Sequence, residues 1–325
     1  MDTIYIEKSV LEHPRTKHII EKHKSKKIIP CDRYTEIFNR KKQSFRMQKQ
    51  NPALIVAKKE NSFVHEIPAH YGIGGSSNYY FSHLLNCPFD CQYCFLQGMY
   101  KSANYVLFVN YEDFQSEILQ KLTDNSYFFT GYDADSLALE STTNFVSEFL
   151  PFFERNPNAY FELRTKSVNI RSLTTSKVVP NCIVAYTLSP KIVSEKIELR
   201  SPSLDNRLNS ISELQKMGWN IGLRFDPIMY VEDFQKTYSE FFEHVFSKIS
   251  ERKLHSVTTG SFRIPVSLFK TMKQNVYNKK ILAYLDKNNS NYEYSKKLAQ
   301  GLISFCNDQL CKYVDKNKVF LCQEF

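Results

Sequence analysis

The feature that most constrains the fold is a regular alternation of short apolar runs and longer amphipathic stretches from residue 78 onward. Runs rich in β-branched and aromatic residues predict six strands, at 78–85, 127–132, 160–165, 182–188, 220–228 and 255–264. The stretches between them predict helices at 111–123, 141–154, 203–217 and 232–249. Parallel strands need long crossover connections, which helices usually supply. We therefore predict an α/β fold whose six parallel strands form an open sheet or, as we expect, curl into a partial (β/α)6 barrel.

The flanks of this pattern have their own features. Residues 291–314 predict a final helix whose apolar face holds Leu298, Leu302, Phe305 and Leu310. We expect residues 1–75 to form a basic N-terminal region and residues 76–325 to form the barrel domain, including the C-terminal helix. Of the 325 residues 42% are hydrophobic, so the chain can fill a sizeable core.

Positive charge is concentrated near the N-terminus. The first 59 residues contain 15 Lys and Arg against six Asp and Glu, whereas the remaining residues are neutral overall and the whole chain carries +9. Lysine and arginine gain affinity for nucleic acids by releasing counterions from phosphates. The segment therefore indicates a polyanionic partner such as DNA, or a solvated arm that promotes solubility. If DNA is the partner, its salt-dependent binding involves Lys24, Lys26, Lys27, Lys41 and Lys42.

The sequence shows neither a membrane-spanning run nor a secretion signal. No run approaches 18 consecutive apolar residues, and MDTIYIEKSV lacks the basic-then-apolar pattern of a signal peptide. We therefore expect a cytoplasmic protein without a membrane partner. Cytosolic thiols are kept reduced, so the eight cysteines are not expected to form a disulfide framework. Clustered cysteines then indicate metal or redox chemistry.

Three cysteines follow the first predicted strand. Cys87, Cys91 and Cys94 lie in NCPFDCQYCF at the spacing C-x3-C-x2-C. Active sites of α/β folds lie at the carboxyl ends of the strands, which is where this loop falls. Three thiolates can hold three irons of a 4Fe-4S cluster and leave the fourth iron open for a ligand. The alternatives are a Cys3His zinc site completed by His83, or unconnected buried thiols.

This loop and four further segments resemble a known family. A C-x3-C-x2-C loop after the first of six β/α units is similar to that of the radical S-adenosylmethionine (AdoMet) enzymes. More narrowly, the chain resembles the spore photoproduct lyase family and its DNA repair photolyase relatives in CPFDCQYCFLQ, ELRTKS at 162–167, YTLSP at 186–190, SLDNR at 203–207 and FDPI at 225–228. The resemblance extends from IYIEKSVLEHPRT to the terminal VFLCQEF.

The resemblance implies radical chemistry. The methionine part of AdoMet chelates the open iron, one electron cleaves the sulfonium, and the resulting 5′-deoxyadenosyl radical abstracts a hydrogen atom. The implied reaction is a carbon–carbon lyase repair of a damaged thymine in DNA, with an electron donor such as flavodoxin or ferredoxin. RNA or a peptide as substrate, a relative that has lost catalysis, and a zinc-containing nucleic-acid-binding module stay open as alternatives.

The resemblance also implies roles for individual residues, beginning with the three cysteines as cluster ligands. Lys166 matches a lysine near the methionine carboxylate, Thr187 matches a serine at the cofactor, and Tyr93 matches a tyrosine beside the cofactor. Ordinary strand, surface or packing roles are the alternatives for these three. Asp226 and Asp135 fall at strand ends, where they can bond the ribose or adenine, or else cap the next helix.

The chain departs from the family in its hydrogen-donor residues. The family returns a hydrogen atom to the repaired thymine through a cysteine after the second strand, but no cysteine lies between Cys94 and Cys182. The matching place is near Gly131–Tyr132, and the family tyrosine after the third ligand is Phe95. Tyr132 is therefore our candidate hydrogen donor.

Three further cysteines lie near the C-terminus. Cys306 and Cys311 are five residues apart on a predicted helix, so their side chains point in different directions. We interpret them and Cys322 as ordinary thiols and not as ligands of a second cluster.

Overall fold

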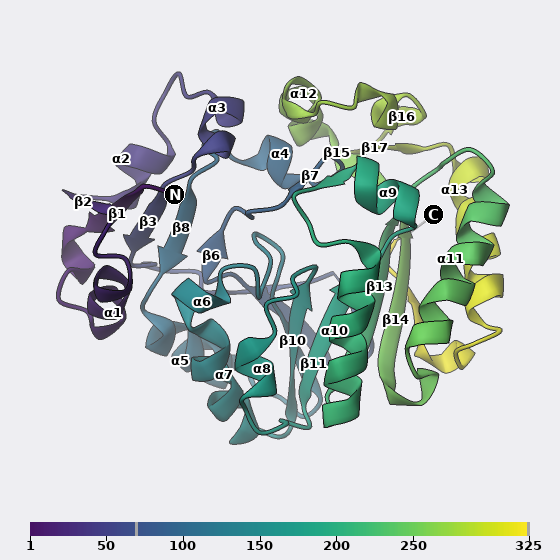
Figure 1. Cartoon of the computed structure of the whole chain (residues 1–325), viewed down its shortest axis with the longest axis horizontal. Coiled ribbons are helices and arrows are strands. Elements are labelled where there is room, and N and C mark those ends of the chain that lie inside the picture. Colours follow the sequence, from purple (N-terminus) through teal and green to yellow (C-terminus); the bar gives the residue numbers. More distant parts are fainter. Residues whose placement is uncertain (69–70, 324–325) are drawn as a thin grey trace.

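The structure is a computed structural model that describes residues 1–68 and 71–323, and two sheets organise it (Figure 1). The larger sheet contains β4 (Val64–Glu66), β5 (Ser77–Phe81), β9 (Ser126–Phe129), β10 (Ala159–Thr165), β11 (Cys182–Thr187), β13 (Asn220–Ile228), β14 (Leu254–Ser261) and β18 (Val319–Leu321). Its order is β18-β14-β13-β11-β10-β9-β5-β4. Neighbouring strands are parallel except for the antiparallel pair of β4 and β5.

The six predicted parallel strands are confirmed, and they follow one another across the sheet in chain order. Two details differ from the prediction. The first strand ends at Phe81, and Leu84–Leu85 forms a separate strand, β6, in the other sheet. In addition, β18 lies parallel to β14 as a seventh parallel strand, in a segment for which no element was predicted. The partial barrel is therefore one strand wider than the sequence indicated.

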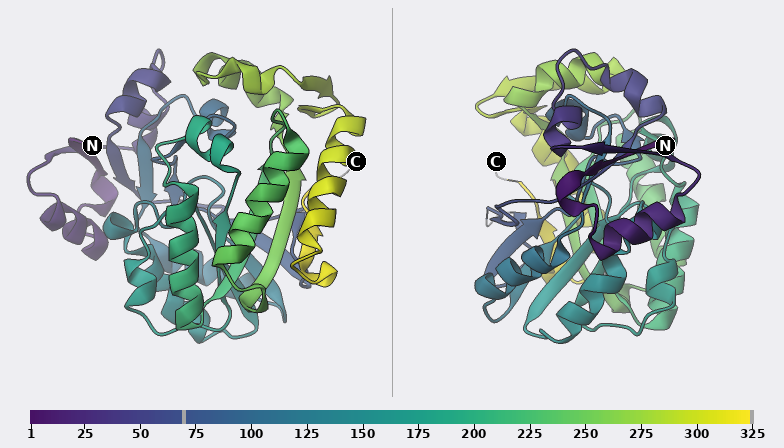
Figure 2. Two further views of the ribbon diagram at one scale, coloured as in Figure 1. Left: turned by 45° about the vertical axis from the view of Figure 1, so that its right-hand side comes forward. Right: turned by 90° about the vertical axis from the view of Figure 1, so that its left-hand side faces the viewer.

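Helices connect successive strands and pack on the outside of the curled sheet (Figures 1 and 2). They are α5 (Tyr111–Lys121), α6 (Glu140–Thr143), α7 (Phe145–Glu154), α8 (Arg171–Thr174), α10 (Leu204–Met217), α11 (Phe234–Lys248) and α13 (Lys296–Leu310). Ser203 caps α10 by accepting a hydrogen bond from the amide of Asn206, and Gly218 ends the helix with φ +102°. The predicted helix at 141–154 is interrupted at Asn144, whose φ of +51° is left-handed.

The basic N-terminal region is folded, around a core that it shares with Leu84 and Leu107, and is not a solvated arm. The second sheet has the order β2-β1-β3-β8-β6 and consists of β1 (Thr3–Glu7), β2 (Lys27–Cys31), β3 (Leu54–Ala57), β8 (Tyr105–Phe108) and β6. The helices beside it are α1 (Pro14–Lys22), α2 (Tyr34–Phe38) and α3 (Phe45–Gln50). Ile4, Ile6 and Leu54 are fully buried there. Strands from both sides of residue 75 share this sheet, and a domain boundary at that residue stays a prediction.

A layer of short elements lies over the carboxyl ends of the barrel strands, at the top of Figure 1. It consists of β7 (Asp90–Cys91), α4 (Leu96–Met99), α9 (Lys191–Lys196), β12 (Glu198–Leu199), β15 (Arg263–Pro265), α12 (Val266–Asn275), β16 (Leu285–Asn288) and β17 (Asn291–Tyr294). The prediction of a helix from residue 291 was wrong for its first turn. Residues 291–294 pair antiparallel with β15 and β16, and the helix begins only after the Ser295 cap.

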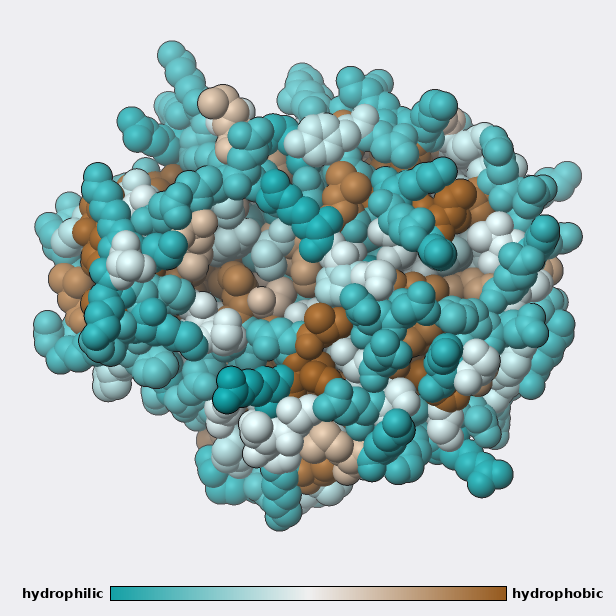
Figure 3. Space-filling view, in the orientation of Figure 1, coloured by the Kyte–Doolittle hydropathy of each residue, from teal (hydrophilic) through white to brown (hydrophobic). Residues whose placement is uncertain are grey.

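Hydrophilic residues cover most of the face shown in Figure 3, with a smaller group of hydrophobic residues near its middle. Short 3-10 turns lie at Lys8–Val10, Glu251–Lys253, Lys279–Leu282 and Lys316–Lys318. None of the helices in residues 1–68 and 71–323 combines the length and the apolar character needed to cross a bilayer.

Candidate active site

A cavity of about 610 Å³ lies between the cysteine loop, the ends of the barrel strands and α12. All the predicted site residues line it: Cys87, Cys91, Tyr93, Cys94, Tyr132, Asp135, Lys166, Thr187 and Asp226. Parallel strands place the residues that follow them at one edge of the sheet, so segments distant in sequence meet there. The structure therefore brings the whole predicted set together, while the individual roles stay predictions.

The loop that carries the three cysteines is folded by local hydrogen bonds. Cys91 lies in β7, which pairs with β12, and the amide of Cys94 donates to the carbonyl of Cys91 at 3.1 Å. Asn86 begins the loop with φ +68° and its side-chain amide donates to the carbonyls of Ser102 and Asn104 at 2.8 and 2.7 Å. These bonds make the loop turn back on itself, so that all three thiols reach the same cavity.

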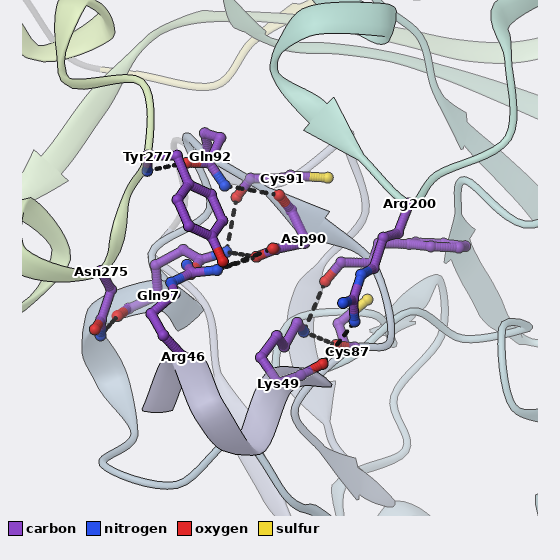
Figure 4. A network of polar contacts seen from close by, with 11 residues as sticks. Arg46, Lys49, Cys87, Asp90, Cys91, Gln92, Gln97, Arg200, Asn275 and Tyr277 are labelled. Atoms are coloured by element: carbon purple, nitrogen blue, oxygen red, sulfur yellow. Dashed lines mark hydrogen bonds and ion pairs between the residues drawn. The ribbon is translucent and has the colours of Figure 1, made fainter. Parts of the chain in front are cut away.

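Two basic residues of α3 hold the loop from below (Figure 4). Lys49 is buried and its ammonium donates to the carbonyls of Cys87 and Phe89, while Arg46 donates to both carboxylate oxygens of Asp90 at 3.0 and 2.9 Å. Both residues belong to the basic N-terminal segment that was predicted to face a polyanion. Their charged groups instead bind the cysteine loop inside the molecule, which the number of basic residues in the sequence could not reveal.

The other side of the loop contacts the end of α12 (Figure 4). Asn275 donates from its side-chain amide to the carbonyl of Gln97 at 2.6 Å, and the amide of Tyr277 donates to Gln92. At Gly98 a Cβ atom would lie 2.6 Å from the carbonyl oxygen of Leu268, so only glycine lets α4 approach α12 this closely. The cysteine loop is thus fixed between two regions that are far apart in the sequence.

His83 is not placed to be the fourth ligand of a Cys3His zinc site. The ring of His83 is buried and stacks on Phe145, with ring centroids 3.6 Å apart and planes 4° apart. Burial lowers the pKa of His83 to about 3, and the residue does not line the cavity. Within the residues that the structure describes, no three His, Cys, Asp or Glu side chains are arranged to hold a single metal ion.

The three thiols on this cavity provide one ligand for each of three irons of a 4Fe-4S cluster. Burial raises the pKa of Cys87 to about 12, so binding of iron must displace protons from the thiols. Lys49 and Lys166 are close enough to affect the pKa values of these cysteines, and both ammonium groups favour the thiolate form. A pair of cations beside three thiols therefore fits a 4Fe-4S cluster with three protein ligands.

Lys166 follows β10 and lies above the ring of Tyr93, with its ammonium 5.5 Å from the ring centroid. Burial alone would lower the pKa of Lys166, but the nearby Cys91 and Glu198 raise it, so the side chain stays charged. The hydroxyl of Tyr93 donates to the carboxylate of Glu198. Tyr93 therefore offers the face of its ring to the cation, while its hydroxyl fixes its position.

Sequence reasoning missed the buried ion pair behind these residues. Glu198 and Arg207 are both fully buried, with 2.6 Å between Oε2 and Nη2. Arg207 also donates to the carbonyl of Thr187 at 3.1 Å, which fixes the end of β11 at the cavity. Arg207 is the arginine of the SLDNR segment, so the motif was a usable signal, but nothing in the sequence identified Glu198 as its partner.

Asp135 has a structural role at the cavity wall. Its carboxylate accepts from the hydroxyl of Thr165 at 2.7 Å, from the amide of Lys166 at 2.6 Å and from the amides of Leu137 and Ala138. These contacts agree with a turn aspartate, but Asp135 does not cap the next helix, because the N-cap residue of α6 is Leu139. Its effect on the site is to set the backbone from which Lys166 projects.

Asp226 lies in β13, near its carboxyl end at the cavity, and precedes a cis proline peptide bond to Pro227. Its carboxylate is 3.6 Å from the guanidinium of Arg263. At Gly260 a Cβ atom would lie 2.9 Å from the Oδ1 atom of Asp226, so this glycine leaves the space for the carboxylate.

Tyr132 lies just beyond β9 on the same cavity. Its ring is 4.8 Å from the ring of Tyr80, and the guanidinium of Arg164 lies 5.6 Å from its centroid. Burial raises the pKa of Tyr132 to about 12, so the phenol keeps its proton at neutral pH. At the preceding Gly131, φ is +89° and a Cβ atom would lie 2.7 Å from the carbonyl of Arg164, which leaves no room for a cysteine side chain.

The three C-terminal cysteines lie in different surroundings. Cys306 is on the buried face of α13, and Cys311 is exposed just after the helix. Cys322, which was also interpreted as an ordinary thiol, instead lines the cavity that holds the cysteine loop.

Comparison with known proteins points to one family. The family model of spore photoproduct lyase matches residues 1–309. Similar proteins are the spore photoproduct lyase of Clostridium acetobutylicum, 23% identical over 209 residues (61% of this chain and 62% of the relative), and that of Bacillus subtilis (strain 168), 21% identical over 188 residues (56% and 55%). The aligned segments thus span less than two thirds of each relative.

Solved structures show the same fold over the full length. A spore photoproduct lyase mutant with bound AdoMet and dinucleoside spore photoproduct has a TM-score of 0.85 at 15% identity and covers 100% of this chain and 98% of its own. A spore photoproduct lyase complexed with dinucleoside spore photoproduct has a TM-score of 0.82 at 16% identity and covers 99% and 98%. Because the family model spans nearly all of the sequence, the chain belongs to the spore photoproduct lyase family.

Proposed function

We propose that the protein is a radical AdoMet enzyme that repairs the spore photoproduct in DNA by breaking the carbon–carbon bond between two thymines. The observation that carries the proposal is a single cavity lined by three loop cysteines, a charged lysine and a tyrosine, in a chain of this family. A cytoplasmic location and flavodoxin or ferredoxin as electron donor stay predictions of the sequence.

The cofactors have defined positions in this proposal. Cys87, Cys91 and Cys94 would hold a 4Fe-4S cluster, and Lys166 and Thr187 would bind the methionine part of AdoMet. When bound, this pair supplies a 5′-deoxyadenosyl radical by one-electron cleavage of AdoMet. The protein keeps Lys166 protonated, holds Tyr93 through Glu198, and places α12 along the cavity wall, where it limits the access of water to a radical.

The opposite wall of the cavity suits a nucleotide lesion. Arg263 lies 5.3 Å from the ring centroid of Tyr71, and Arg164 lies beside Tyr132, so cations and aromatic rings alternate there. Aromatic faces stack on bases, and guanidinium groups bind phosphates. A thymine pair must leave the duplex stack to reach these groups.

The proposed function is tested by repair of a dinucleoside spore photoproduct. Anaerobically reconstituted protein, AdoMet and dithionite are expected to yield the thymine dinucleoside and 5′-deoxyadenosine, both measured by liquid chromatography. Loss of a charge-assisted hydrogen bond costs roughly 1.5–3 kcal/mol, so Lys166→Met is expected to raise the KM for AdoMet about 10- to 100-fold. Cleavage of AdoMet without thymine recovery would contradict this substrate and favour the RNA or peptide alternative.

DNA as a partner rests on the exposed part of the basic region. The ammonium of Lys24 is 2.5 Å from the carboxylate of Glu21, and that of Lys26 is 3.6 Å from the carboxylate of Asp2. These carboxylates partly neutralise the two lysines and so weaken their attraction for phosphates. Lys27, Lys41 and Lys42 are exposed, so we propose that these three lysines contact the DNA backbone.

Replacing these three lysines by glutamine is expected to flatten the dependence of log Kd on log salt by about one unit for each lost phosphate contact. Fluorescence anisotropy with duplex DNA at several salt concentrations measures the slope. The matched control replaces Lys296, Lys297 and Lys312 by glutamine. These lysines are exposed as well and belong to α13 or directly follow it, and α13 lies at the opposite end of the molecule from β2 in Figure 1. Equal slopes for both triple variants would place the DNA surface elsewhere.

A further inference from the structure

A fourth thiol lies on the candidate active-site cavity. Cys322 directly follows β18, the parallel strand that the sequence did not predict, and only 4% of the residue is exposed. It lines the same cavity as Cys87, Cys91 and Cys94. Cys322 belongs to neither the cysteine loop nor the strand end after which the family resemblance places its hydrogen-donating cysteine.

The backbone of Cys322 is held firmly at the strand ends. Its amide donates to the carbonyl of Thr259 at 2.8 Å, and its carbonyl accepts from Nη2 of Arg263 at 2.6 Å. The next residue, Gln323, accepts from the amide of Ser261 through its side chain. The thiol is therefore presented by an ordered extension of the sheet, next to an arginine that lines the proposed substrate wall.

Cys322 and Tyr132 line the same cavity although 190 positions separate them in the sequence, and Tyr132 and Phe320 of β18 pack against one cluster of buried residues. Cys322 is close enough to affect the pKa values of Tyr132 and Arg164. Tyr132 stands where the family resemblance places its hydrogen-donating cysteine, and Gly131 beside it has no space for a side chain. The thiol missing from that strand end is thus supplied to the same cavity from the edge strand β18.

The surroundings keep this thiol in its protonated form. Burial, followed by the charge of Asp226, raises the pKa of Cys322, and these outweigh Arg164, Arg224 and the Thr258 hydroxyl, which act in the opposite direction. A hydrogen-atom donor must carry its hydrogen before the radical arrives, and both Cys322 and Tyr132 do so at neutral pH. Thiols transfer hydrogen atoms to carbon radicals faster than phenols, which favours the cysteine as donor.

We propose that Cys322 is the hydrogen-atom donor that completes repair in this chain, an inference that rests on the proposed function. The S–H bond breaks homolytically, and its hydrogen forms a C–H bond on the thymine-derived carbon radical. The unpaired electron is left on the Sγ atom. One electron from the external reductant that the proposed activity already requires, together with one proton from water, restores the thiol.

The test follows hydrogen from the thiol into the product. Repair of the dinucleoside spore photoproduct is run in D₂O, where S–H and O–H groups exchange to deuterium, and the recovered thymines are analysed by mass spectrometry. The unsubstituted protein is expected to place one deuterium on a recovered thymine. Cys322→Ala and Cys322→Ser are both expected to lose this deuterium and the recovered thymine dinucleoside, while 5′-deoxyadenosine is still formed, which shows that the cofactor site is intact.

Two controls separate the alternatives. Cys311→Ala removes an exposed thiol outside the cavity and is expected to leave deuterium incorporation unchanged. Tyr132→Phe removes the alternative donor, and whatever its rate of repair, each thymine that it recovers is expected to carry the deuterium. Retention of deuterium in Cys322→Ala together with its loss in Tyr132→Phe would overturn the inference and make Tyr132 the donor. If even the unsubstituted protein recovers no thymine, the proposed function itself fails, and the inference fails with it.

Discussion

Cys91→Ala protein is expected to contain almost no iron–sulfur cluster and to form no 5′-deoxyadenosine from AdoMet. Two remaining thiolates cannot fix a cuboidal cluster with one open iron, so both cofactor functions are lost together. The fold is expected to survive, because Cys91 is held in the β7–β12 pair by its backbone and its side chain faces the cavity. Iron and acid-labile sulfide after anaerobic reconstitution, and 5′-deoxyadenosine by chromatography, measure the two losses.

Cys311→Ala is the matched control for this experiment, since it removes an exposed thiol that does not line the cavity. It is expected to keep the iron content and the brown colour of the unsubstituted protein. Circular dichroism of both variants checks that the secondary structure is unchanged. A Cys91→Ala variant with full iron content would show that the assignment of the cluster ligands is wrong.

Arg207→Met is expected to lower the free energy of unfolding by about 3–5 kcal/mol, because it leaves a buried carboxylate without its guanidinium partner. Glu198 and Arg207 are both fully buried, and Arg207 also donates to the carbonyl of Pro202 at 2.9 Å. Urea unfolding followed by circular dichroism measures the loss. Because Arg207 also fixes the end of β11 at Thr187, weaker binding of AdoMet is expected to accompany it.

The loss in Arg207→Met is expected to depend on pH in a defined direction. In the unsubstituted protein burial raises the pKa of Glu198, but Arg207 and Lys166 outweigh it and hold that pKa below the ordinary value of 4.5. The pair therefore stabilises the fold above that value, and the contribution disappears as the pH falls through the lowered pKa. Without Arg207, burial raises the pKa of Glu198, so this carboxylate takes up a proton more easily and no longer leaves a buried charge. The loss in the free energy of unfolding of Arg207→Met is therefore expected to be smaller at about pH 5 than at neutral pH.

Lys177→Met provides the comparison for a surface pair. Lys177 lies 2.8 Å from Glu154, but the two side chains are 82% and 42% exposed. Exposed ion pairs contribute roughly 0–1 kcal/mol, so this variant is expected to unfold almost as the unsubstituted protein does. Similar losses for Lys177→Met and Arg207→Met would contradict the importance assigned to the buried pair.

The elements of the barrel were predictable because periodicity and capping are local. Apolar runs predict strands, and the spacing in 203–217 places Leu204, Leu208 and Ile211 on the face that α10 buries. The cysteine loop was predictable for the same reason, as its three ligands lie within one short segment. Its place at the carboxyl ends of the strands followed from the topology of parallel sheets.

By itself the sequence determined the type and order of the barrel elements and the chemistry of the cysteine loop. Only the tertiary structure decided which distant side chains complete the site. Lys49 contacts a loop 38 residues away, Tyr93 bonds to Glu198 across 105 positions, and Cys322 reaches the cavity through a strand that lacks a clear local pattern. The physical reason is that local periodicity fixes how one segment is folded, whereas contacts between distant segments depend on how the whole chain packs.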